Sequence, residues 1–524
     1  MSPPWWKSAV VYQLYPRSFA GSGGPVGTLD GIRAHLDQIE WLGVDAIWLS
    51  PFFRSPMADF GYDVADYCAV DPLFGTLDDF DRLLADAHRR GLRVLVDWVP
   101  NHTSDQHPWF VEARRSRDSA TRDWYVWRDG SPDRPPNNWT AAFIEAPAWT
   151  WDDTTGQWYL HCFLPQQPDL NWGNPEVVEA MHGVVRFWLD RGVDGFRVDV
   201  VQCLGKPPDL PDDPPELAGI PHSALNDRAE THPILRDLRR LFDSYSGERV
   251  MVGEVYLLST ALVAKYYGAG DELHLAFNFP PLYAPWDADA WRERVERVVA
   301  ELDPIDAWPT WVLSNHDNRR HRTRYGGSEA RARAAAVLLL TLRGTPFLYQ
   351  GEELGLEDAV VPPERQVDPG GRDGCRAPIP WTGASGHGWG VDDPWLPWPP
   401  DASARNVEDL RADDGSILHL YRRLLRARRG SDALRAGSFR LLPAPAGALA
   451  WERVAEGDRR IVAVNFTDTA VDIALTGDWV VEVASDGDGE GVRATGRLAP
   501  DQAVLLREGS VREGSAHEAQ RGRA

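Results

Sequence analysis

Eight short β-rich runs recur along this chain, and segments with the apolar spacing of amphipathic helices separate them. The runs are VVYQLYP (10–16), DAIWLSP (45–51), LRVLVDWVP (92–100), GFRVDVV (195–201), VMVGEVY (250–256), LHLAFNF (273–279), TWVLSNHD (310–317) and TPFLYQGEELG (345–355). Strands that alternate with helices form parallel sheets. Eight such units over about 430 residues favour an α/β fold of the (β/α)₈ TIM barrel type over an open doubly wound sheet.

The segments between the runs have helical signals of their own. Residues 29–43 (LDGIRAHLDQIEWLG) and 77–91 (LDDFDRLLADAHRRG) are amphipathic, and each ends in glycine. Glycine is the residue that most often follows the last turn of a helix. We therefore expect one helix in each segment, packed against the outside of the barrel.

Two regions depart from the repeat. Residues 103–170 are rich in Trp, Asp, Pro and Gly and are too many for one crossover, so we expect an inserted lid domain there. After a final helix near 416–429, short alternating strands such as ALAWERV, RRIVAVNF and WVVEVAS predict a C-terminal antiparallel β-sandwich. The predicted units are the barrel at 1–102 and 171–432, the lid at 103–170, the sandwich at 433–508 and a flexible tail at 509–524.

Charge and cysteine usage exclude several classes of protein. The 524 residues carry a net charge of −23, with acids spread along the chain, so nucleic acid is not an expected partner. Four cysteines far apart (Cys68, Cys162, Cys203 and Cys375) indicate neither a zinc site nor a disulfide framework. No signal peptide and no run of about 18 apolar residues is present. We expect a cytoplasmic protein, monomer or homodimer, with no membrane partner.

The run GFRVDVV contains two charges that an ordinary barrel strand does not need. Arg197 and Asp199 are two residues apart, so on a strand they point to the same face. A strand covered on both faces is expected to be almost continuously apolar. An arginine and an aspartate on one face of such a strand therefore indicate a pocket in which the arginine holds a reactive carboxylate in its ionised form.

Other predicted strands also end in polar side chains. Active sites of barrels lie at the C-terminal ends of the strands. For Asp97 alone a structural role is the better interpretation. Several acids at the same end of the barrel favour an active site, because each buried carboxylate costs free energy of folding unless it is paired. The residues that end strands three, four, five and seven are Asp97, Asn101, His102, Arg197, Asp199, Glu254, Asn315, His316 and Asp317.

With these motifs in order, the chain resembles an α-glucosidase of the α-amylase superfamily, glycoside hydrolase family 13, in its oligosaccharide-cleaving branch. The resemblance is dense over residues 5 to about 385 and lies in DWVPNH (97–102), GFRVD (195–199), GE (253–254), SNHD (314–317), QPDLNW (167–172) and YQGEELG (349–355). It implies that Asp199 is the nucleophile, that Glu254 is the general acid and then base, and that Asp317 grips sugar hydroxyls. A retaining mechanism needs one ionised and one protonated carboxyl, and Arg197 is expected to keep Asp199 ionised.

The resemblance also implies a set of residues around the terminal glucose. Asp63 and Arg376 would bind the non-reducing hydroxyls and close the pocket, which predicts exo-action. Tyr62 and Phe163 would supply ring faces, although each fits the core equally well. The segment GRDGCRAPIPW departs from the branch after Arg376, where Thr and Met are usual. The substrate-binding residues implied are Tyr62, Asp63, His102, Phe163, Arg197, His316 and Arg376.

The loop after the first strand makes a second departure. In this branch it is usually rich in Asp and binds a calcium-like ion, but here it reads AGSGGPVGTLDG (20–31). A hard cation needs six or more oxygen ligands, which these side chains do not provide. We expect no metal in this loop and no cofactor.

The expected reaction is release of α-glucose from short, maltose-type oligosaccharides, with transglycosylation as a second outcome. One alternative within the family is a glucosyl isomerase, such as a trehalose synthase or sucrose isomerase. Another is an oligo-1,6-glucosidase, because the residue after the nucleophile, Val200, resembles the one in members that accept α-1,6 bonds. The segment NRRHRTRYGG (318–327) resembles hydrolases more than isomerases. A non-catalytic carbohydrate-binding relative would be expected to lack an acid or to carry an anchor.

Overall fold

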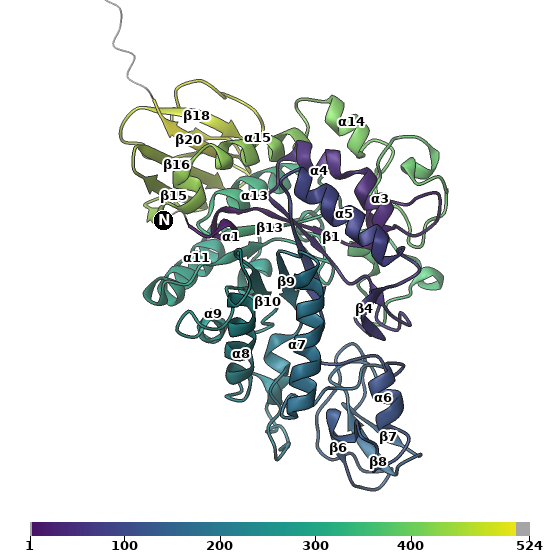
Figure 1. Cartoon of the computed structure of the whole chain (residues 1–524). Coiled ribbons are helices and arrows are strands. Elements are labelled where there is room, and N and C mark those ends of the chain that lie inside the picture. The colour runs from purple at the N-terminus through teal and green to yellow at the C-terminus, as the bar shows by residue number, and fades with distance from the viewer. Residues whose placement is uncertain (1–2, 510–524) are drawn as a thin grey trace, which may run out of the picture.

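The computed structural model describes residues 3–509, and its centre is one eight-stranded parallel sheet (Figure 1). The strands neighbour one another in the order β11-β10-β9-β5-β2-β1-β13-β12. They are β1 (Val11–Leu14), β2 (Ala46–Leu49), β5 (Arg93–Trp98), β9 (Gly195–Val198), β10 (Val250–Gly253), β11 (Leu275–Ala276), β12 (Thr310–Val312) and β13 (Thr345–Tyr349). Each predicted run contains one of these strands, so the predicted barrel is confirmed. The two outermost strands approach each other, because Thr310 Oγ1 donates to the carbonyl of Ala276 at 2.8 Å.

Helices cover the outside of this sheet (Figure 1). The segment expected to form one helix at 29–43 is divided at His35, whose Nδ1 lies 2.8 Å from the carbonyl of Gly31. The described helices are α1 (Trp5–Ser8), α2 (Pro16–Phe19), α3 (Leu29–Ala34), α4 (Leu36–Leu42), α5 (Leu77–Arg89), α6 (Pro108–Ala113), α7 (Pro175–Asp190), α8 (Thr231–Asp243), α9 (Thr260–Ala264), α10 (Phe279–Leu282), α11 (Ala288–Leu302), α12 (His321–Arg324), α13 (Glu329–Thr341), α14 (Val407–Ala412), α15 (Ile417–Arg429) and α16 (Asp432–Ala436).

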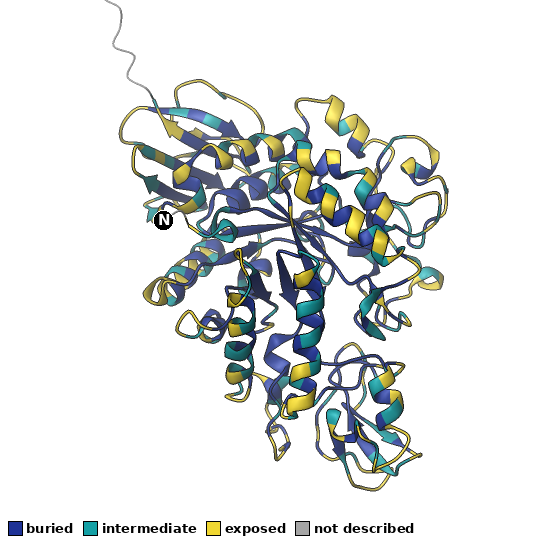
Figure 2. Cartoon of the chain, viewed as in Figure 1, coloured by how far each residue is buried: buried dark blue, intermediate teal, exposed yellow. Residues whose placement is uncertain are grey.

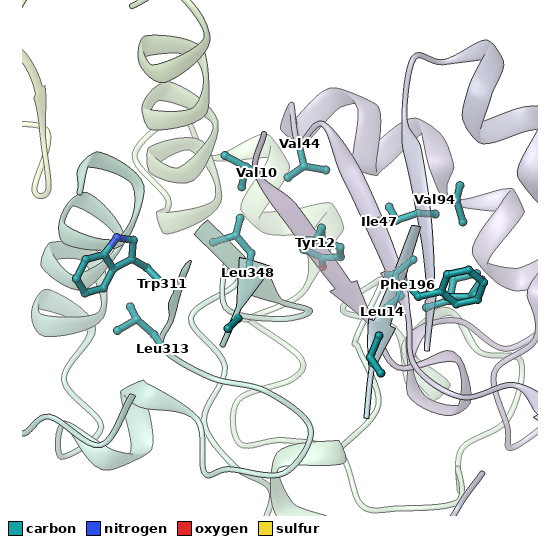
Figure 3. Packing of buried hydrophobic residues seen from close by; sticks show 14 of the residues in the cluster. Val10, Tyr12, Leu14, Val44, Ile47, Val94, Phe196, Trp311, Leu313 and Leu348 are labelled. Carbon is teal, nitrogen blue, oxygen red and sulfur yellow. The ribbon is translucent and has the colours of Figure 1, made fainter. Parts of the chain in front are cut away.

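Alternate residues of each barrel strand enter two different packing layers. On β1, Tyr12 and Leu14 pack with Ile47 and Phe196 between the sheet and the helices (Figure 3). Val11 on the same strand faces the barrel interior, in a cluster with Trp48, Leu95, Val252 and Phe347. This alternation is the one expected when a sheet is buried on both faces. The barrel strands are accordingly dark over most of their length when coloured by burial (Figure 2), with Arg93 at the start of β5 as an exposed exception.

The lid lies between β5 and β9 in the chain and projects from the C-terminal end of the barrel (Figure 1). It contains α6 and a three-stranded antiparallel sheet in the order β6-β8-β7, with β6 (Trp127–Arg128), β7 (Trp149–Asp152) and β8 (Gln157–Leu160). A short hairpin of β3 (Phe53–Arg54) and β4 (Asp66–Val70) lies beside it, since Ser104 N donates to the carbonyl of Val64 at 2.7 Å. The lid thus leaves the barrel where polar side chains end the strands.

The C-terminal unit is antiparallel. Five strands lie in the order β14-β15-β16-β20-β18, and β17 pairs with β19. They are β14 (Ser438–Leu442), β15 (Ala448–Ala455), β16 (Asp458–Asn465), β17 (Val471–Asp472), β18 (Trp479–Ala484), β19 (Arg497–Leu498) and β20 (Ala503–Glu508). Arg453 on β15 donates to the carbonyl of Thr341 on α13 at 2.9 Å, which ties this sheet to the barrel. The residue boundaries expected for the barrel, the lid and the sandwich stay predictions. The predicted tail at 509–524 lies outside the described residues except for its first residue.

Within residues 3–509 no helix combines the length and the apolar character needed to cross a membrane.

Candidate active site

Arg197 is the centre of the candidate site. Its side chain points from β9 into the mouth of the barrel and is buried. Nη1 donates to Asp199 at 2.6 Å and to Asp97 at 2.8 Å, and Nη2 donates to Glu254 at 2.7 Å. Three acids from three neighbouring strands therefore share one guanidinium group. The structure brings together the residues that the sequence placed at the ends of strands three, four and five.

The turn after β9 contributes a backbone donor to this group. Val200 has φ of 44° and ψ of 47°, a left-handed conformation that a β-branched residue rarely adopts. In this conformation its N–H points to Glu254 Oε2, at 3.2 Å. Strained backbone that persists at a cluster of charged side chains is typical of functional sites.

His316 and Asp317 follow β12 on the opposite side of the mouth. His316 Nε2 lies 3.1 Å from Asp317 Oδ2 and 2.5 Å from the hydroxyl of Tyr62, while Nδ1 accepts from Gln13 Nε2 at 2.7 Å. Burial lowers the pKa of His316 to about 3, so the ring is neutral. A neutral ring that accepts at Nδ1 carries its proton on Nε2, where it faces the Asp317 carboxylate.

Asp317 is held as a carboxylate by three neighbours. Burial opposes its ionisation, but His316, Arg372 and Arg376 together hold its pKa below the ordinary value. Arg372 Nη1 donates to Oδ1 at 3.0 Å, and Arg376 Nη2 donates to the same atom at 3.1 Å. The acid expected to grip substrate hydroxyls is therefore charged and oriented before any substrate enters.

The structure does not place the expected pair of Asp63 and Arg376 on the wall of the cavity. Asp63 is fully buried, and it accepts from Ser55 Oγ at 2.9 Å and from the N–H groups of Asp59 and Ala58 at 2.9 and 2.8 Å. These bonds hold the tight turn in front of Tyr62, and they leave the Asp63 carboxylate pointing away from the cavity. Asp63 is a structural residue of this turn.

Asp59 and Arg372 occupy the place that was expected for Asp63 and Arg376. Arg372 Nη2 donates to Asp59 Oδ1 at 2.6 Å, and both side chains line the cavity. Arg376 is completely buried behind Asp317, where Nε donates to the carbonyl of His316 at 2.8 Å. Arg376 therefore supports Asp317 from behind and does not face a ligand.

Tyr62, His102 and Phe163 do line the cavity. Tyr62 stacks on His316 with ring planes only 6° apart, and its hydroxyl donates to Asp97 at 3.1 Å. The His102 ring lies 5.1 Å from the Phe163 ring, and burial lowers the pKa of His102 to about 4. A neutral imidazole and two aromatic faces suit the alternating apolar and hydroxyl surfaces of a sugar.

The cavity has a volume of about 420 Å³, within the range of small-molecule sites. A larger hollow of about 740 Å³ lies over the lid loop, but none of the three expected catalytic acids lines it. We therefore take the smaller cavity as the site. Its lining residues are Asp59, Tyr62, His102, Ala142, Phe143, Phe163, Asp199, Val200, Gln202, Ile220, Pro221, His222, Glu254, Tyr256, Phe279, Tyr283, Asp317, Asn318, Gly370 and Arg372.

The charge balance around Arg197 differs from the expected one. Burial raises the pKa of Asp199 well above its ordinary value, and the neighbouring Glu254 and Asp97 raise it further, outweighing Arg197. Burial likewise raises the pKa of Asp97 to about 6. One guanidinium cannot neutralise three carboxylates, so repulsion among these acids remains. Arg197 favours the ionised form of Asp199, as expected, but its effect on the pKa is outweighed by burial and by the two neighbouring acids.

The loop after β1 shows what replaces the expected family ion site. Gly21 and Gly27 form an isolated antiparallel bridge, and the one acid in the loop, Asp30, pairs with Arg33 at 3.2 Å. Across residues 3–509 no group of three or more His, Cys, Asp or Glu side chains is arranged to hold a metal ion. The expected absence of an ion at this loop stays a prediction.

Sequence reasoning missed three contributors to the site. Asp59 stands four residues before Asp63 in ADFGYDV, and Arg372 stands four before Arg376 in GGRDGCR, so each was close to a residue that was chosen. Gln167 joins the two sides of the site, since its amide lies 3.1 Å from Asp59 Oδ2 and from His102 Nε2. The signal for Gln167 was the QPDLNW motif, which was assigned no role.

Comparisons with known proteins agree with this geometry. The family described as alpha amylase, catalytic domain, matches residues 13–437. A Rhizobium meliloti (strain 1021) protein named "Probable alpha-glucosidase" is 42% identical over 504 residues, which are 89% of this chain and 90% of the relative. The oligo-1,6-glucosidase of Heyndrickxia coagulans is 36% identical over 520 residues, 89% of this chain and 93% of its own.

Solved structures are similar over nearly the whole chain. The α-glucosyl transfer enzyme XgtA matches with a TM-score of 0.90 and 42% identity, covering 97% of this chain and 100% of that one. The trehalulose synthase MutB from Pseudomonas mesoacidophila MX-45 matches with a TM-score of 0.90 and 34% identity, at the same coverage.

Proposed function

This chain belongs to the α-amylase family and is a glycoside hydrolase, and we propose that it is a retaining, exo-acting α-glucosidase of short α-glucosides. The observation that carries the proposal is the contact of one guanidinium group with two carboxyls. Arg197 Nη1 lies 2.6 Å from Asp199, and Arg197 Nη2 lies 2.7 Å from Glu254. One guanidinium can span two carboxyls only when they are close. Close carboxyls are typical of retaining enzymes, because inverting enzymes leave room for a water between them.

The inner end of the cavity supports exo-action. Asp59, Arg372 and Asp317 form one connected ion pair network there, with donors and acceptors for the hydroxyls of a terminal glucose. Arg372 is further fixed by Asp368, at 2.6 Å, so the network is not free to swing aside. A closed, charged inner end accepts the non-reducing end of a chain and leaves no path for further sugars beyond it.

In the proposed first step, Asp199 attacks the anomeric carbon while Glu254 donates a proton to the leaving oxygen. The C1–oxygen bond to the leaving group breaks and a C1–oxygen bond to Asp199 forms, which gives a β-glucosyl ester. In this step Asp199 acts in its ionised form and Glu254 in its protonated form, the division of roles that a retaining mechanism requires. The Arg197 guanidinium then keeps the deprotonated Asp199 in position for attack.

In the proposed second step, Glu254 takes a proton from water, and the resulting hydroxide oxygen replaces Asp199 on C1. The product is α-glucose, so the configuration is retained. A sugar hydroxyl in place of water gives transglycosylation by the same route. We propose α-1,4-linked maltose-type substrates, with α-1,6 linkages as the alternative that the oligo-1,6-glucosidase relatives support.

Product analysis by NMR tests this proposal. The wild type is incubated separately with maltose, isomaltose, sucrose and trehalose, and the first glucose formed is examined before mutarotation. Early α-glucose from maltose supports the retaining hydrolase, and the relative rates rank the linkages. Rearranged disaccharide with little free glucose would support an isomerase, the activity named for MutB, and early β-glucose would contradict retention.

The location proposed for this enzyme is the cytoplasm. The four cysteines are free thiols in the structure, and three of them are buried. Free thiols are typical of a reducing compartment. Fractionation of the native host would test it, and activity found only outside the cell would contradict it.

A further inference from the structure

A second cavity, of about 250 Å³, lies at the N-terminal end of the barrel, opposite the active site. One wall comes from the residues directly before β1 and β2, and the other comes from α15 and α16. Three of its lining residues are arginines and one is an acid, so the cavity is cationic in a chain whose net charge is −23. The lining residues are Ser8, Val10, Asp45, Leu425, Arg428, Arg429 and Arg435.

The acid of this cavity is already used by the fold. Asp45 Oδ2 accepts from the N–H of Val10 at 2.9 Å, and Asp45 Oδ1 accepts from Arg429 Nη2 at 3.0 Å. These two bonds tie the starts of β1 and β2 to the end of α15. One carboxylate balances one arginine, so two of the three positive charges around the cavity remain.

Arg428 is buried with no acid beside it. It is only 2% exposed, and it donates to the carbonyls of Leu340 and Gly344 at 3.0 and 2.7 Å. These carbonyls lie at the C-terminal end of α13, but among residues 3–509 this side chain forms no salt bridge. Burial lowers the pKa of Arg428 to about 10, and the charge of Arg435 acts in the same direction. Arg428 is therefore still a cation at neutral pH, and it lacks a close counter-charge.

The other two arginines have donors to spare. Every hydrogen bond that the side chain of Arg429 makes to the described residues uses Nη2, which leaves Nε and Nη1. Within residues 3–509 the side chain of Arg435 pairs only with Asp432, at 3.8 Å, and the Asp432 side chain is 82% exposed. An ion pair so long and so exposed contributes little. Both guanidinium groups can therefore donate to a ligand in the cavity.

We propose that this cavity binds a phosphate group, carried either by inorganic phosphate or by a small phosphate monoester. Guanidinium groups match the geometry of phosphate oxygens and bind them two at a time. A water takes up about 30 Å³ in the liquid, so a cavity of about 250 Å³ holds a tetrahedral oxyanion and several waters. One dianion balances the two positive charges that Asp45 leaves.

The phosphate site is separate from the glucosidase chemistry. None of its lining residues lines the active-site cavity. A bound phosphate would join α15 and α16 to the barrel, and α15 packs against β18 of the C-terminal sheet (Figure 1). A ligand that binds only the folded chain stabilises it. The inference therefore goes beyond the proposed function, and it predicts a stabilising anion that takes no part in the reaction.

Equilibrium dialysis of the full chain against radiolabelled inorganic phosphate, at constant ionic strength and pH 7, tests the proposal. We expect saturable binding of one phosphate per chain, competition by sulfate and no competition by chloride. The melting temperature is expected to rise with the phosphate concentration. Arg435→Gln is expected to raise the Kd for phosphate by at least about tenfold, because it removes one charged donor pair from the ligand.

Arg426→Gln is the matched control. Arg426 lies on α15 two residues before Arg428, but it is exposed and does not line the cavity. Both variants remove one positive charge, so a difference between them reports the cavity and not the overall charge of the chain. A melting curve without phosphate checks that both fold. Arg435→Lys gives a second reading, because it keeps the charge but loses the planar donor pair, and it is expected to weaken binding less than Arg435→Gln.

Glycerol 3-phosphate in the same assay distinguishes the two sources of the phosphate group. Tighter binding than that of inorganic phosphate assigns the cavity to a monoester, and weaker binding assigns it to free phosphate. The inference is overturned if neither probe saturates, or if Arg435→Gln and Arg426→Gln bind the probe equally well. The readout is binding, so failure of the glucosidase proposal would show in the sugar assays and leave this result unchanged.

Discussion

The two ends of the barrel both bury aspartate among arginines, yet the balance of charge is opposite. At the N-terminal end, the carboxylate of Asp194 meets two arginines, a histidine and a backbone amide. They are His88 at 2.7 Å, Arg93 at 2.8 Å, Arg249 at 3.6 Å and the N–H of Val94 at 2.9 Å. Burial opposes ionisation of Asp194, but these partners lower its pKa.

At the C-terminal end the acids outnumber the cation. Asp97, Asp199 and Glu254 share Arg197, and the pKa of Asp199 is raised. Surplus carboxylates around one cation repel one another, and such a group is typical of a functional site, whereas the partners of Asp194 favour its ionised form and stabilise the fold. The difference between Asp194 and the group around Arg197 therefore lies in the ratio of acids to cations and not in burial, since both are buried.

Asp199→Asn is expected to have the largest effect on activity. Without the carboxylate nucleophile, kcat is expected to fall by at least about 10⁴-fold. The fold is expected to survive, because the change also removes one of three mutually repelling acids from the buried group. Steady-state kinetics with maltose and a melting curve check both parts, and activity that survives in a pure preparation would disprove the nucleophile.

Asp194→Asn is the counterpart at the other end. It is expected to lower the free energy of unfolding by about 2 kcal/mol at pH 7, because two arginines and a histidine lose the carboxylate they share. The folded pKa of Asp194 is lowered, so its contribution is present above the ordinary carboxyl pKa and is lost as the pH falls through the folded pKa. Urea unfolding at pH 7 and pH 3.5 measures this, with the difference between variant and wild type shrinking at the lower pH. Specific activity of the folded enzyme should be kept, and a large loss would contradict the comparison.

Asp97→Asn tests whether Asp97 influences the pKa of the nucleophile Asp199. It keeps the shape of a side chain that accepts from Arg197, Tyr62 and Trp48, but removes one negative charge. The pKa of Asp199 should then fall, because Asp97 is one of the groups that raise it. The acid limb of the kcat/KM profile is expected to move to lower pH by about one unit. An acid limb that does not move, or that moves to higher pH, would show that Asp97 does not couple to the nucleophile.

Glu353→Gln tests a buried acid that has no cation within hydrogen-bonding distance. Glu353 accepts from the hydroxyl of Tyr12 at 2.7 Å and from the N–H of Gly351 at 2.9 Å, and burial raises its pKa to about 7. A raised carboxyl pKa means that stability is present below the unfolded value and is lost as the pH rises toward 7. Glutamine cannot ionise, so the variant should gain roughly 2 to 3 kcal/mol relative to wild type between pH 5 and pH 8. Equal slopes of stability against pH in the two proteins would contradict this.

Removal of divalent ions is expected to have the smallest effect. Incubation with EDTA should leave both the melting temperature and the rate of maltose hydrolysis unchanged, because the Gly-rich loop after β1 offers a single acid, Asp30, that is already paired with Arg33. A large drop in either quantity, restored by added calcium, would show that an ion site exists.

The strands of the barrel and the residues at their ends could be predicted because they follow local patterns. Each β-rich run contains one barrel strand, and neighbouring parallel strands bring their C-terminal ends to the same edge of the sheet. Asp199, Glu254 and Asp317 line one cavity for this reason.

The choice between Asp59 and Asp63 could not be predicted in the same way. Both are acids within four residues of Tyr62, and only the turn decides which one faces the cavity. That turn contains Phe60 at φ of 48° and Gly61 at φ of 113°, and no linear spacing rule covers such a backbone. The division of the helix at His35 and the raised pKa of Asp199 likewise depend on three-dimensional surroundings. The first goes with a bond to Gly31, and the second is caused by burial.

The most direct test of the central claim is to trap the glucosyl ester. Glu254→Gln is incubated with α-glucosyl fluoride, whose leaving group needs no proton, and the intact protein and its peptides are then weighed by mass spectrometry. We expect the added mass of one glucosyl residue on the peptide that contains Asp199, and no adduct when Asp199→Asn is added to the same variant. An adduct on another residue, or fluoride release without any adduct in the first variant, would contradict the assignment of Asp199 as the nucleophile.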